Sequence, residues 1–263
     1  MSLDVLMELV LNNIGKVFYN EGTPKTVLQD VSFSVKEGQF VTLLGPSGCG
    51  KTTLLSIIAG FLKASSGEVK LNGVLVNKPG PDRGFVFQDF ALFPWMTVRE
   101  NILFPMKQQS MDRKEQNRRL KILLAMAQLE GAEHLFPSQI SGGMKQRAAF
   151  IRALAGNPQV LLMDEPLGAV DHQMRQILQE ELEALWLKNR TTVLMVTHDV
   201  EEAIYLSDRV LVMSSQEGKI LGDVRIDLAR PRERNDKRYY LFKSQLTDML
   251  KSAFKQAVSS KGG

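Results

Sequence analysis

The sequence has little that would suit a secreted or a membrane-spanning protein. Its 263 residues include one cysteine, Cys49, so no disulfide can form within the chain and nothing requires an oxidising compartment. No apolar run approaches the roughly 18 to 20 residues that span a bilayer as a helix. The first residues carry Asp4 and Glu8 and lack the basic start and the cleavage site of a secretory signal. We therefore expect a cytosolic protein, which another chain would hold at any membrane where it works.

The chain also lacks a strong charge of either sign. Lys and Arg number 33 and Asp and Glu 29, which leaves a formal net charge of +4, and 44% of the residues are hydrophobic. These values are ordinary for a globular protein and exclude a disordered or fibrous chain. A small positive excess indicates nucleic-acid binding only where it clusters, and an anionic ligand or a membrane surface explains it as well. The length fits one large domain or a domain with a smaller inserted lobe.

The hydrophobic pattern predicts an α/β protein. Residues 5–44 have the alternation and the turn residues that are typical of β-strands. The last strand expected there, 40–44, leads into a glycine-rich turn and then into a helix that ends at Gly60. The segments 160–163 and 192–196 are apolar throughout and alternate with helices, which indicates a parallel sheet covered on both faces.

Other segments are expected to be helical. Charged residues and an apolar stripe share the segment 98–135, and a further helix is expected to begin near Ser141, so we predict a small helical lobe at about 98–155. It lies within a main domain at 1–225. A C-terminal extension at 226–263 is expected to form one amphipathic helix. The apolar stripe of that helix either packs on its own domain or serves as a dimer or regulatory contact.

The glycine-rich turn has the pattern of a phosphate-binding loop. Residues 45–52 match G-x-x-x-x-G-K-[ST] in full, between a strand and a helix, whereas a chance match would be a plain glycine-rich turn. Backbone amides and the helix N-terminus would surround the phosphates of ATP, Lys51 would reach the β- and γ-phosphates, and Thr52 would coordinate Mg²⁺. Cys49 is a small filler or a site of oxidative inhibition. The residues expected to bind the nucleotide here are Gly45, Pro46, Ser47, Gly48, Cys49, Gly50, Lys51, Thr52 and Thr53.

Two carboxylates follow the apolar strand at 160–163. Ligands bind at the carboxyl ends of strands in open α/β sheets, and Asp164 and Glu165 lie at such an end. Asp164 would hold Mg²⁺, and Glu165 would polarise the water that attacks the γ-phosphate. Adjacent carboxylates also occur by chance on surfaces, but the preceding run is too apolar for a surface loop.

A third motif, Ile140-Ser-Gly-Gly-Met-Lys-Gln-Arg147, resembles the signature motif of the ATP-binding cassette (ABC) family of ATPases. A capping Ser141 followed by Gly142 and Gly143 at a helix start is a second anion site with outward-facing amides. The resemblance implies a P-loop NTPase cassette with a parallel-sheet core, an antiparallel β subdomain and an inserted helical lobe. It also implies a head-to-tail dimer, in which each ATP lies between the P-loop of one chain and the signature of the other. Met144 replaces the usual glutamine of the signature, so that side-chain contact is lost.

The same resemblance assigns further roles. Gln88, after the strand expected at 84–87, is similar to the glutamine that contacts Mg²⁺ and the γ-phosphate and links the site to a membrane partner. His198 is similar to the histidine that contacts the γ-phosphate and positions the water. Asp171 fits the loop that communicates between the two sites. Phe18 aligns best with the aromatic residue that stacks on adenine, with Tyr19 as the alternative.

Two segments, 81–88 and 92–102, resemble the ATPase subunits of bacterial nitrate, sulfonate and taurine importers. The resemblance implies import of a small anion, and it implies as partners a second ATPase subunit (an identical chain or a close paralogue), transmembrane permease subunits and a periplasmic or surface solute-binding protein. It places the chain peripherally at the cytoplasmic face of the bacterial inner membrane. The alternative is a soluble ABC ATPase acting on nucleic acid, but the long coiled coil or second cassette of such proteins is absent from the sequence, so we expect no nucleic-acid partner.

Overall fold

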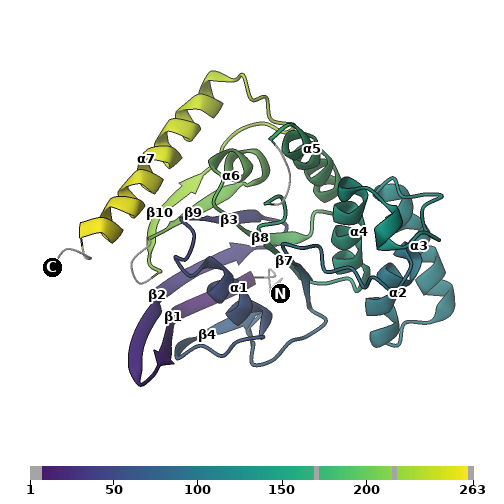
Figure 1. Ribbon diagram of the computed structural model, residues 1–263, viewed down its shortest axis with the longest axis horizontal. Coiled ribbons are helices and arrows are strands. Elements are labelled where there is room, and N and C mark those ends of the chain that lie inside the picture. Colours follow the sequence, from purple (N-terminus) through teal and green to yellow (C-terminus); the bar gives the residue numbers. More distant parts are fainter. Residues whose placement is uncertain (1–7, 169–171, 215–217, 260–263) are drawn as a thin grey trace, which may run out of the picture. The chain divides into compact units, whose positions relative to one another are not determined.

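The computed structural model describes residues 8–168, 172–214 and 218–259. The chain folds into two compact units. The first unit comprises residues 1–80 and 192–263, and the second unit comprises residues 81–191. Figure 1 labels the helices and strands, and both units contain elements of each kind.

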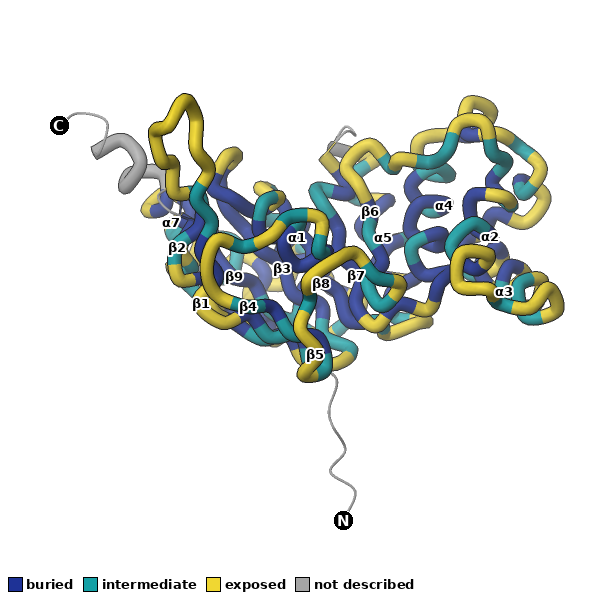
Figure 2. The backbone as a smooth tube through the Cα atoms, turned by 90° about the horizontal axis from the view of Figure 1, so that it is seen from below, coloured by how far each residue is buried: buried dark blue, intermediate teal, exposed yellow. Residues whose placement is uncertain are grey.

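Parallel strands form the buried centre of the first unit. β3 (Phe40–Leu44) pairs in parallel with β8 (Thr192–Thr197) on one side and with β9 (Arg209–Met213) on the other, and β10 (Ile220–Arg225) pairs antiparallel with β9. Every residue of β3 and β8 is buried (Figure 2). This confirms the prediction for strands that are apolar throughout, because a strand covered on both faces has no side chain in contact with water.

A separate antiparallel sheet completes the strands of the first unit. β1 (Glu8–Asn20) and β2 (Thr23–Lys36) form a hairpin, and the sheet order is β2-β1-β4-β5, with β4 at Ser66–Leu71 and β5 at Val74–Leu75. The hairpin loop is Glu21-Gly22, and both residues have positive φ (49° and 83°). Positive φ at both positions gives a turn whose twist matches that of the strands, so this turn explains where the hairpin closes.

The predicted amphipathic helix of the C-terminal extension is α7 (Lys237–Ser259). It packs against α6 (Val200–Leu206) and against β9 and β10 (Figure 1). Among residues 237–253, whose burial the structure describes, the buried side chains are those of Tyr239, Leu246, Leu250 and Ala253. Of the two roles left open for the apolar stripe, packing on its own domain is therefore the one observed.

Three helices pack together in the second unit: α2 (Val98–Gln108), α3 (Arg113–Met126) and α4 (Gly142–Ala155). The helical segment expected at 98–135 contains α2 and α3, and the chain turns between them at Ser110, which has φ +55°. The outer boundaries of the helical lobe and of the C-terminal extension stay predictions. The elements of this unit are β6 (Arg83–Val86) and β7 (Val160–Asp164), which pair in parallel, α2 (Val98–Gln108), α3 (Arg113–Met126), α4 (Gly142–Ala155), α5 (His172–Asn189) and a 3₁₀ turn at Pro137–Gln139.

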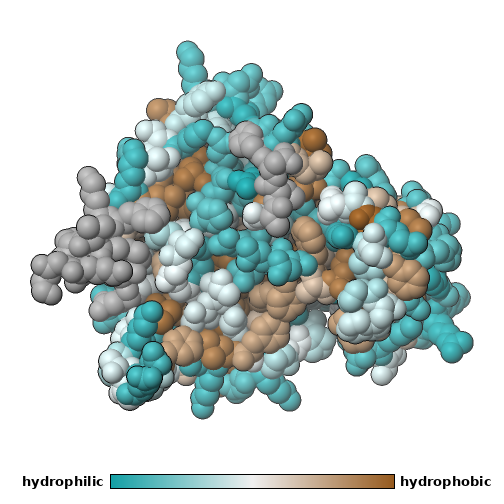
Figure 3. Space-filling model, viewed as in Figure 1, coloured by the Kyte–Doolittle hydropathy of each residue, from teal (hydrophilic) through white to brown (hydrophobic). Residues whose placement is uncertain are grey.

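The surface has no continuous apolar belt on the face shown in Figure 3, where hydrophobic patches are separated by hydrophilic side chains. In the described part of the chain, no helix has both the length and the apolar character that crossing a membrane requires.

Candidate functional site

The phosphate-binding loop joins β3 to α1 (Lys51–Ala59), the helix that ends at Gly60 as predicted. Gly48 and Gly50 have φ values of +80° and +99°, which side chains rarely tolerate, so the two glycines allow the loop to turn into the helix. The first turn of α1 contains no acidic residue. Its amides and the positive end of the helix dipole are therefore available to an anion, as the sequence predicts for a nucleotide phosphate.

Lys51 folds back over this loop. Its side chain is buried, and its Nζ donates hydrogen bonds to the carbonyl oxygens of Gly45 (2.8 Å) and Pro46 (3.0 Å). The positive charge therefore lies inside the loop rather than in solvent. Of the other predicted loop residues, Ser47, Gly48 and Thr52 are exposed, Thr53 is half-buried and Cys49 is buried. The Thr52 hydroxyl thus lies on an accessible edge at the start of α1, where a phosphate-bound cation would approach.

His198 lies at the same edge of the parallel sheet as the loop. Leu44 and Thr197 are register partners, and the Gly45 amide donates to the Thr197 carbonyl oxygen (3.3 Å), so the residues that follow the two strands are neighbours. The exposed His198 starts a turn into α6. Asp199 caps this helix, because its carboxylate accepts the Glu201 amide at 2.7 Å.

Gln88, Asp164 and Glu165 come together in the second unit. Val86 and Met163 are register partners in the parallel pair of β6 and β7, so the residues that follow them share one edge. A Cβ atom at Gly168 would lie 3.5 Å from Gln88 Nε2 and 3.7 Å from Glu165 Cβ. The predicted glutamine and the predicted base therefore approach the same glycine.

Glu165 has an unusual backbone. Its φ is +43°, and its carbonyl oxygen accepts the Gly168 amide at 3.0 Å. A non-glycine residue in the left-handed region is uncommon and costs on the order of 1–3 kcal/mol, and such strain clusters at functional sites. The backbone conformation of Glu165 therefore supports the prediction that this carboxylate is functional, rather than the alternative that it lies on the surface by chance.

Ser141 caps α4 as the sequence predicts. Its Oγ accepts the Met144 amide at 3.2 Å, and the first turn of α4 contains no acidic residue. Ser141 and Gly142 are exposed, and a Cβ atom at Gly142 would meet nothing within 4 Å. Gly143 is half-buried, and a Cβ atom there would lie 3.3 Å from Leu178. The predicted second anion site thus lies at exposed residues that face open space.

The predictions for the adenine-stacking aromatic residue and for Asp171 stay untested. Phe18 and Tyr19 lie near the end of β1 with exposed rings, and Lys16 Nζ lies 4.9 Å from the centre of the Phe18 ring. Since neighbouring residues of a strand point to opposite faces, only one of the two rings can serve a given ligand. Asp171 lies outside the described residues.

The sequence reasoning missed Arg152. This α4 residue is buried, and its guanidinium donates to the carbonyl oxygens of Ala91 (2.6 Å) and Phe90 (3.0 Å) in the segment that follows Gln88. Phe90 and Ala91 both have positive φ (59° and 45°). Burial lowers the pKa of the Arg152 guanidinium. An arginine on the apolar side of a helix is the one signal that would have found it.

Comparison with known proteins identifies the family. The sequence profile of the ABC transporter family matches residues 28–168, more than half of the chain. The chain belongs to the ABC transporter family. It is 41% identical to the bicarbonate transport ATP-binding protein CmpD of Synechocystis sp. (94% of this chain, 90% of the relative) and 42% identical to the nitrate import ATP-binding protein NrtD of Synechococcus elongatus (92% and 90%). It is also 42% identical to the aliphatic sulfonates import ATP-binding protein SsuB of Bacillus cereus (89% and 92%).

A solved structure supports the same assignment. The dimeric, post-hydrolysis ATP-binding cassette MJ0796, bound to ADP and Pi, superposes with a TM-score of 0.70 at 33% identity over 83% of this ABC chain and 98% of that chain. The predicted fold, the ATPase activity and the resemblance to importer ATPases are thereby confirmed. The roles of the individual site residues stay predictions.

Proposed function

We propose that this ABC ATPase powers the import of a small anion, such as nitrate, sulfonate, taurine or bicarbonate, through a separate membrane permease. The observation that carries the proposal is the presence of two helix starts without acidic residues, at Lys51 and at Gly142, in a chain whose named relatives are bicarbonate, nitrate and sulfonate transport ATPases. The first helix start has the loop and the lysine that ATP phosphates require. The second opens outward and suits the nucleotide of a second chain.

ATP would bind with Mg²⁺ held by Thr52, Gln88 and Asp164. Mg²⁺ binds few protein oxygens when it is shared with phosphates and keeps several waters. Within the described ranges no three His, Cys, Asp or Glu side chains cluster as a metal site. The bound ion would neutralise charge on the β- and γ-phosphates.

Hydrolysis would then depend on positioned side chains. Lys51 neutralises the phosphates, Glu165 accepts the proton of the attacking water, and His198 contacts the γ-phosphate. Each ATP would lie between the P-loop of one chain and Ser141 to Gly143 of its partner, with Asp171 communicating between the sites. The dimeric state of the similar cassette supports this arrangement. The partner is a second copy or a close paralogue.

The proposed membrane partners are permease subunits, and a solute-binding protein would deliver the anion to them. An aromatic segment after Gln88 supports the docking, because the Trp95 side chain is 69% exposed and packs on Phe93 with ring centres 5.6 Å apart. Exposed aromatic side chains are typical of interface anchors. The chain would thus lie peripherally at the cytoplasmic face of a bacterial inner membrane. The relatives do not favour a nucleic-acid partner.

The test is the variant Glu165→Gln, with Glu130→Gln on an exposed turn of the same unit as control. The glutamine keeps the size of the side chain and removes its basicity. We expect Glu165→Gln to bind ATP and to dimerise with it, but to lose nearly all turnover, whereas Glu130→Gln hydrolyses ATP like the wild type. Turnover of Glu165→Gln at the wild-type rate would refute the assignment. Co-purification with nucleic acid in place of a multi-span membrane protein would refute the proposed transport role.

A further inference from the structure

The C-terminal helix α7 is bonded to the helix that follows His198. The Tyr239 side chain is buried, and its hydroxyl donates to the Glu201 carbonyl oxygen at 3.3 Å. One turn further along α7, Lys243 Nζ forms an ion pair with the Glu201 carboxylate. Burial and the nearby Glu201 charge raise the pKa of the Tyr239 phenol, so this hydroxyl remains a donor. Both contacts reach the first turn of α6, three residues after His198.

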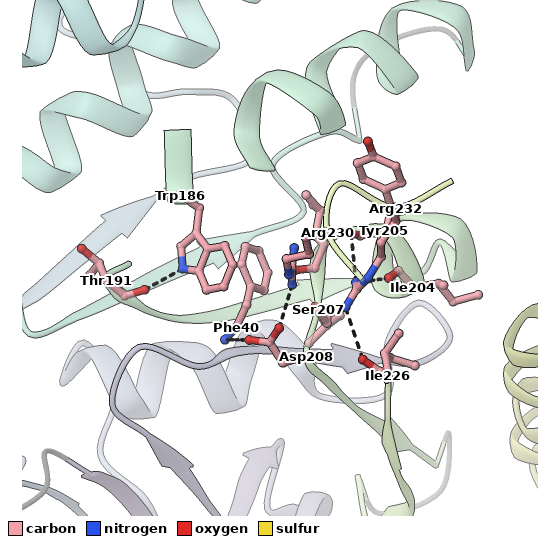
Figure 4. A network of polar contacts seen from close by, with 12 residues as sticks. Phe40, Trp186, Thr191, Ile204, Tyr205, Ser207, Asp208, Ile226, Arg230 and Arg232 are labelled. Carbon is pink, nitrogen blue, oxygen red and sulfur yellow. Dashed lines mark hydrogen bonds and ion pairs between the residues drawn. The ribbon is translucent and has the colours of Figure 1, made fainter. Parts of the chain in front are cut away.

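The other end of α6 is held by the segment that leads into α7. The Arg232 guanidinium is buried and donates to the carbonyl oxygens of Ile204 and Tyr205 (Figure 4). Arg230 donates to the carbonyl oxygen of Leu206 at 2.6 Å. The last carbonyl groups of a helix have no partner within the helix, and a cation there also interacts favourably with the helix dipole. The C-terminal extension therefore contacts both ends of α6, at Glu201 in the first turn and at the last carbonyl groups.

A chain of hydrogen bonds connects α6 to the turn that carries His198. The buried Glu202 carboxylate accepts the Thr197 hydroxyl at 2.6 Å, and the Thr197 hydroxyl in turn accepts the Asp199 amide at 3.1 Å. The Asp199 carboxylate accepts the amides of Glu201 and Glu202. His198 thus lies between two residues that are fixed to the first turn of α6. A shift of that turn would move the imidazole with it.

We propose that α7 positions His198 for hydrolysis, with Tyr239 and Lys243 as positioning residues that act through Glu201. The proposal rests on the γ-phosphate contact proposed for His198. The C-terminal extension would then influence the rate of ATP hydrolysis, because loss of the contacts to Glu201 changes the position of the His198 imidazole. Lys51 and the phosphate-binding loop would stay unchanged.

The test compares full-length variants in steady-state ATP hydrolysis. Lys243→Met removes the ion pair, Lys243→Arg retains a cation, and Tyr239→Phe removes the hydroxyl. We expect kcat to fall about two- to fivefold in Lys243→Met and further in the double variant, with an unchanged KM for ATP, because a misplaced catalytic group lowers the rate more than binding. Lys243→Arg should restore most of the rate.

Two residues of α7 provide matched controls. Tyr240 follows Tyr239 but is 58% exposed, and Lys251 pairs with Asp248 on α7 itself. We expect Tyr240→Phe and Lys251→Met to hydrolyse ATP like the wild type. A rate equally low in these controls would overturn the proposal, since it would indicate a general effect of altering α7.

Further outcomes separate this proposal from the proposed function. If Lys243→Met and the double variant Tyr239→Phe/Lys243→Met both keep the wild-type kcat while His198→Ala is inactive, the positioning role of α7 is refuted. The proposed function would then still stand. Wild-type turnover in His198→Ala would instead refute the role of the histidine. Combining Glu201→Gln with Lys243→Met should lower kcat no more than either change alone, because each change removes the same ion pair. Lys243 is half-exposed, so the single variant remains informative if the double variant fails to fold.

Discussion

Replacing Arg152 by methionine tests how the segment after Gln88 is held. The guanidinium makes two charge-assisted hydrogen bonds, to the carbonyl oxygens of Phe90 and Ala91, and it lies 5.6 Å from the centre of the Phe93 ring. Methionine fills a similar apolar volume and removes all three interactions. The left-handed backbone at Phe90 and Ala91 then loses the contacts that offset its strain.

The expected loss of stability follows from these contacts. Two hydrogen bonds with a charged partner contribute about 1.5–3 kcal/mol each. Burial of the guanidinium, which lowers the pKa of Arg152, costs part of that gain, and the Ala91 carbonyl can be rehydrated because Ala91 is exposed. We expect Arg152→Met to lower the free energy of unfolding by about 2–3 kcal/mol. Arg152→Lys should lower the free energy of unfolding by about half as much, because an ammonium group lacks the two parallel N–H groups with which a guanidinium reaches two carbonyl oxygens.

Urea unfolding of the full chain measures this loss, from the midpoint and the slope m. Arg118→Met is the matched control, because Arg118 lies on the surface of α3 and pairs with Glu115 within its own helix. It should unfold like the wild type. A loss below about 0.5 kcal/mol for Arg152→Met at unchanged m would refute the reasoning, because this is the range of ordinary surface substitutions.

Three further comparisons of variants test single features of the fold and the site. A Cβ atom at Gly50 would lie 2.8 Å from Leu28, whereas one at Gly48 would meet nothing within 4 Å, so Gly50→Ala should lower the melting temperature more than Gly48→Ala; equal losses would contradict this. Arg209 holds the pKa of Asp223 below its ordinary value, so the stability that Asp223→Asn removes is present above about pH 4 and disappears as the pH falls through the lower folded pKa. Thermal unfolding at pH 6 and at a pH below the folded pKa of Asp223 should show that the stability difference between wild type and Asp223→Asn shrinks at the lower pH. A difference that stays constant would contradict a stabilising ion pair between Arg209 and Asp223. Glu165→Gly should be about 1 kcal/mol more stable than Glu165→Ala, because glycine adopts positive φ without strain; the opposite order in urea unfolding would exclude strain at this residue.

Local motifs explain why much of the fold and the site was predictable. The loop at 45–52 and the cap at Ser141 each depend on residues within one turn of one another, so spacing alone predicts the start of α1 and of α4. The buried strands β3 and β8 were predictable for a similar reason, because a short, mostly apolar run of residues indicates a strand that is buried on both faces. The left-handed backbone of Glu165, in contrast, has no signal in the side chains around it.

The positioning contacts were not predictable, because they join distant parts of the chain. Arg152 bonds a segment 61 residues earlier, and Tyr239 bonds a carbonyl 38 residues earlier. In the sequence Arg152 is one of three basic residues in the segment of α4, and Tyr239 is one of two adjacent tyrosines at the start of the C-terminal helix. Neither spacing nor composition specifies which carbonyl oxygen such a side chain will reach.

In this ABC ATPase, the side chains proposed to carry out hydrolysis differ from the side chains that hold them in place. The residues proposed to meet ATP lie on short turns after parallel strands, and a turn alone does not fix a side chain to the accuracy that hydrolysis requires. Arg152 holds the segment after Gln88, and Glu201, held by Tyr239 and Lys243, supports the turn after β8. Each support comes from a helix that carries none of the side chains proposed for hydrolysis. Changes of these supporting side chains should therefore alter turnover while leaving ATP binding at the phosphate-binding loop intact.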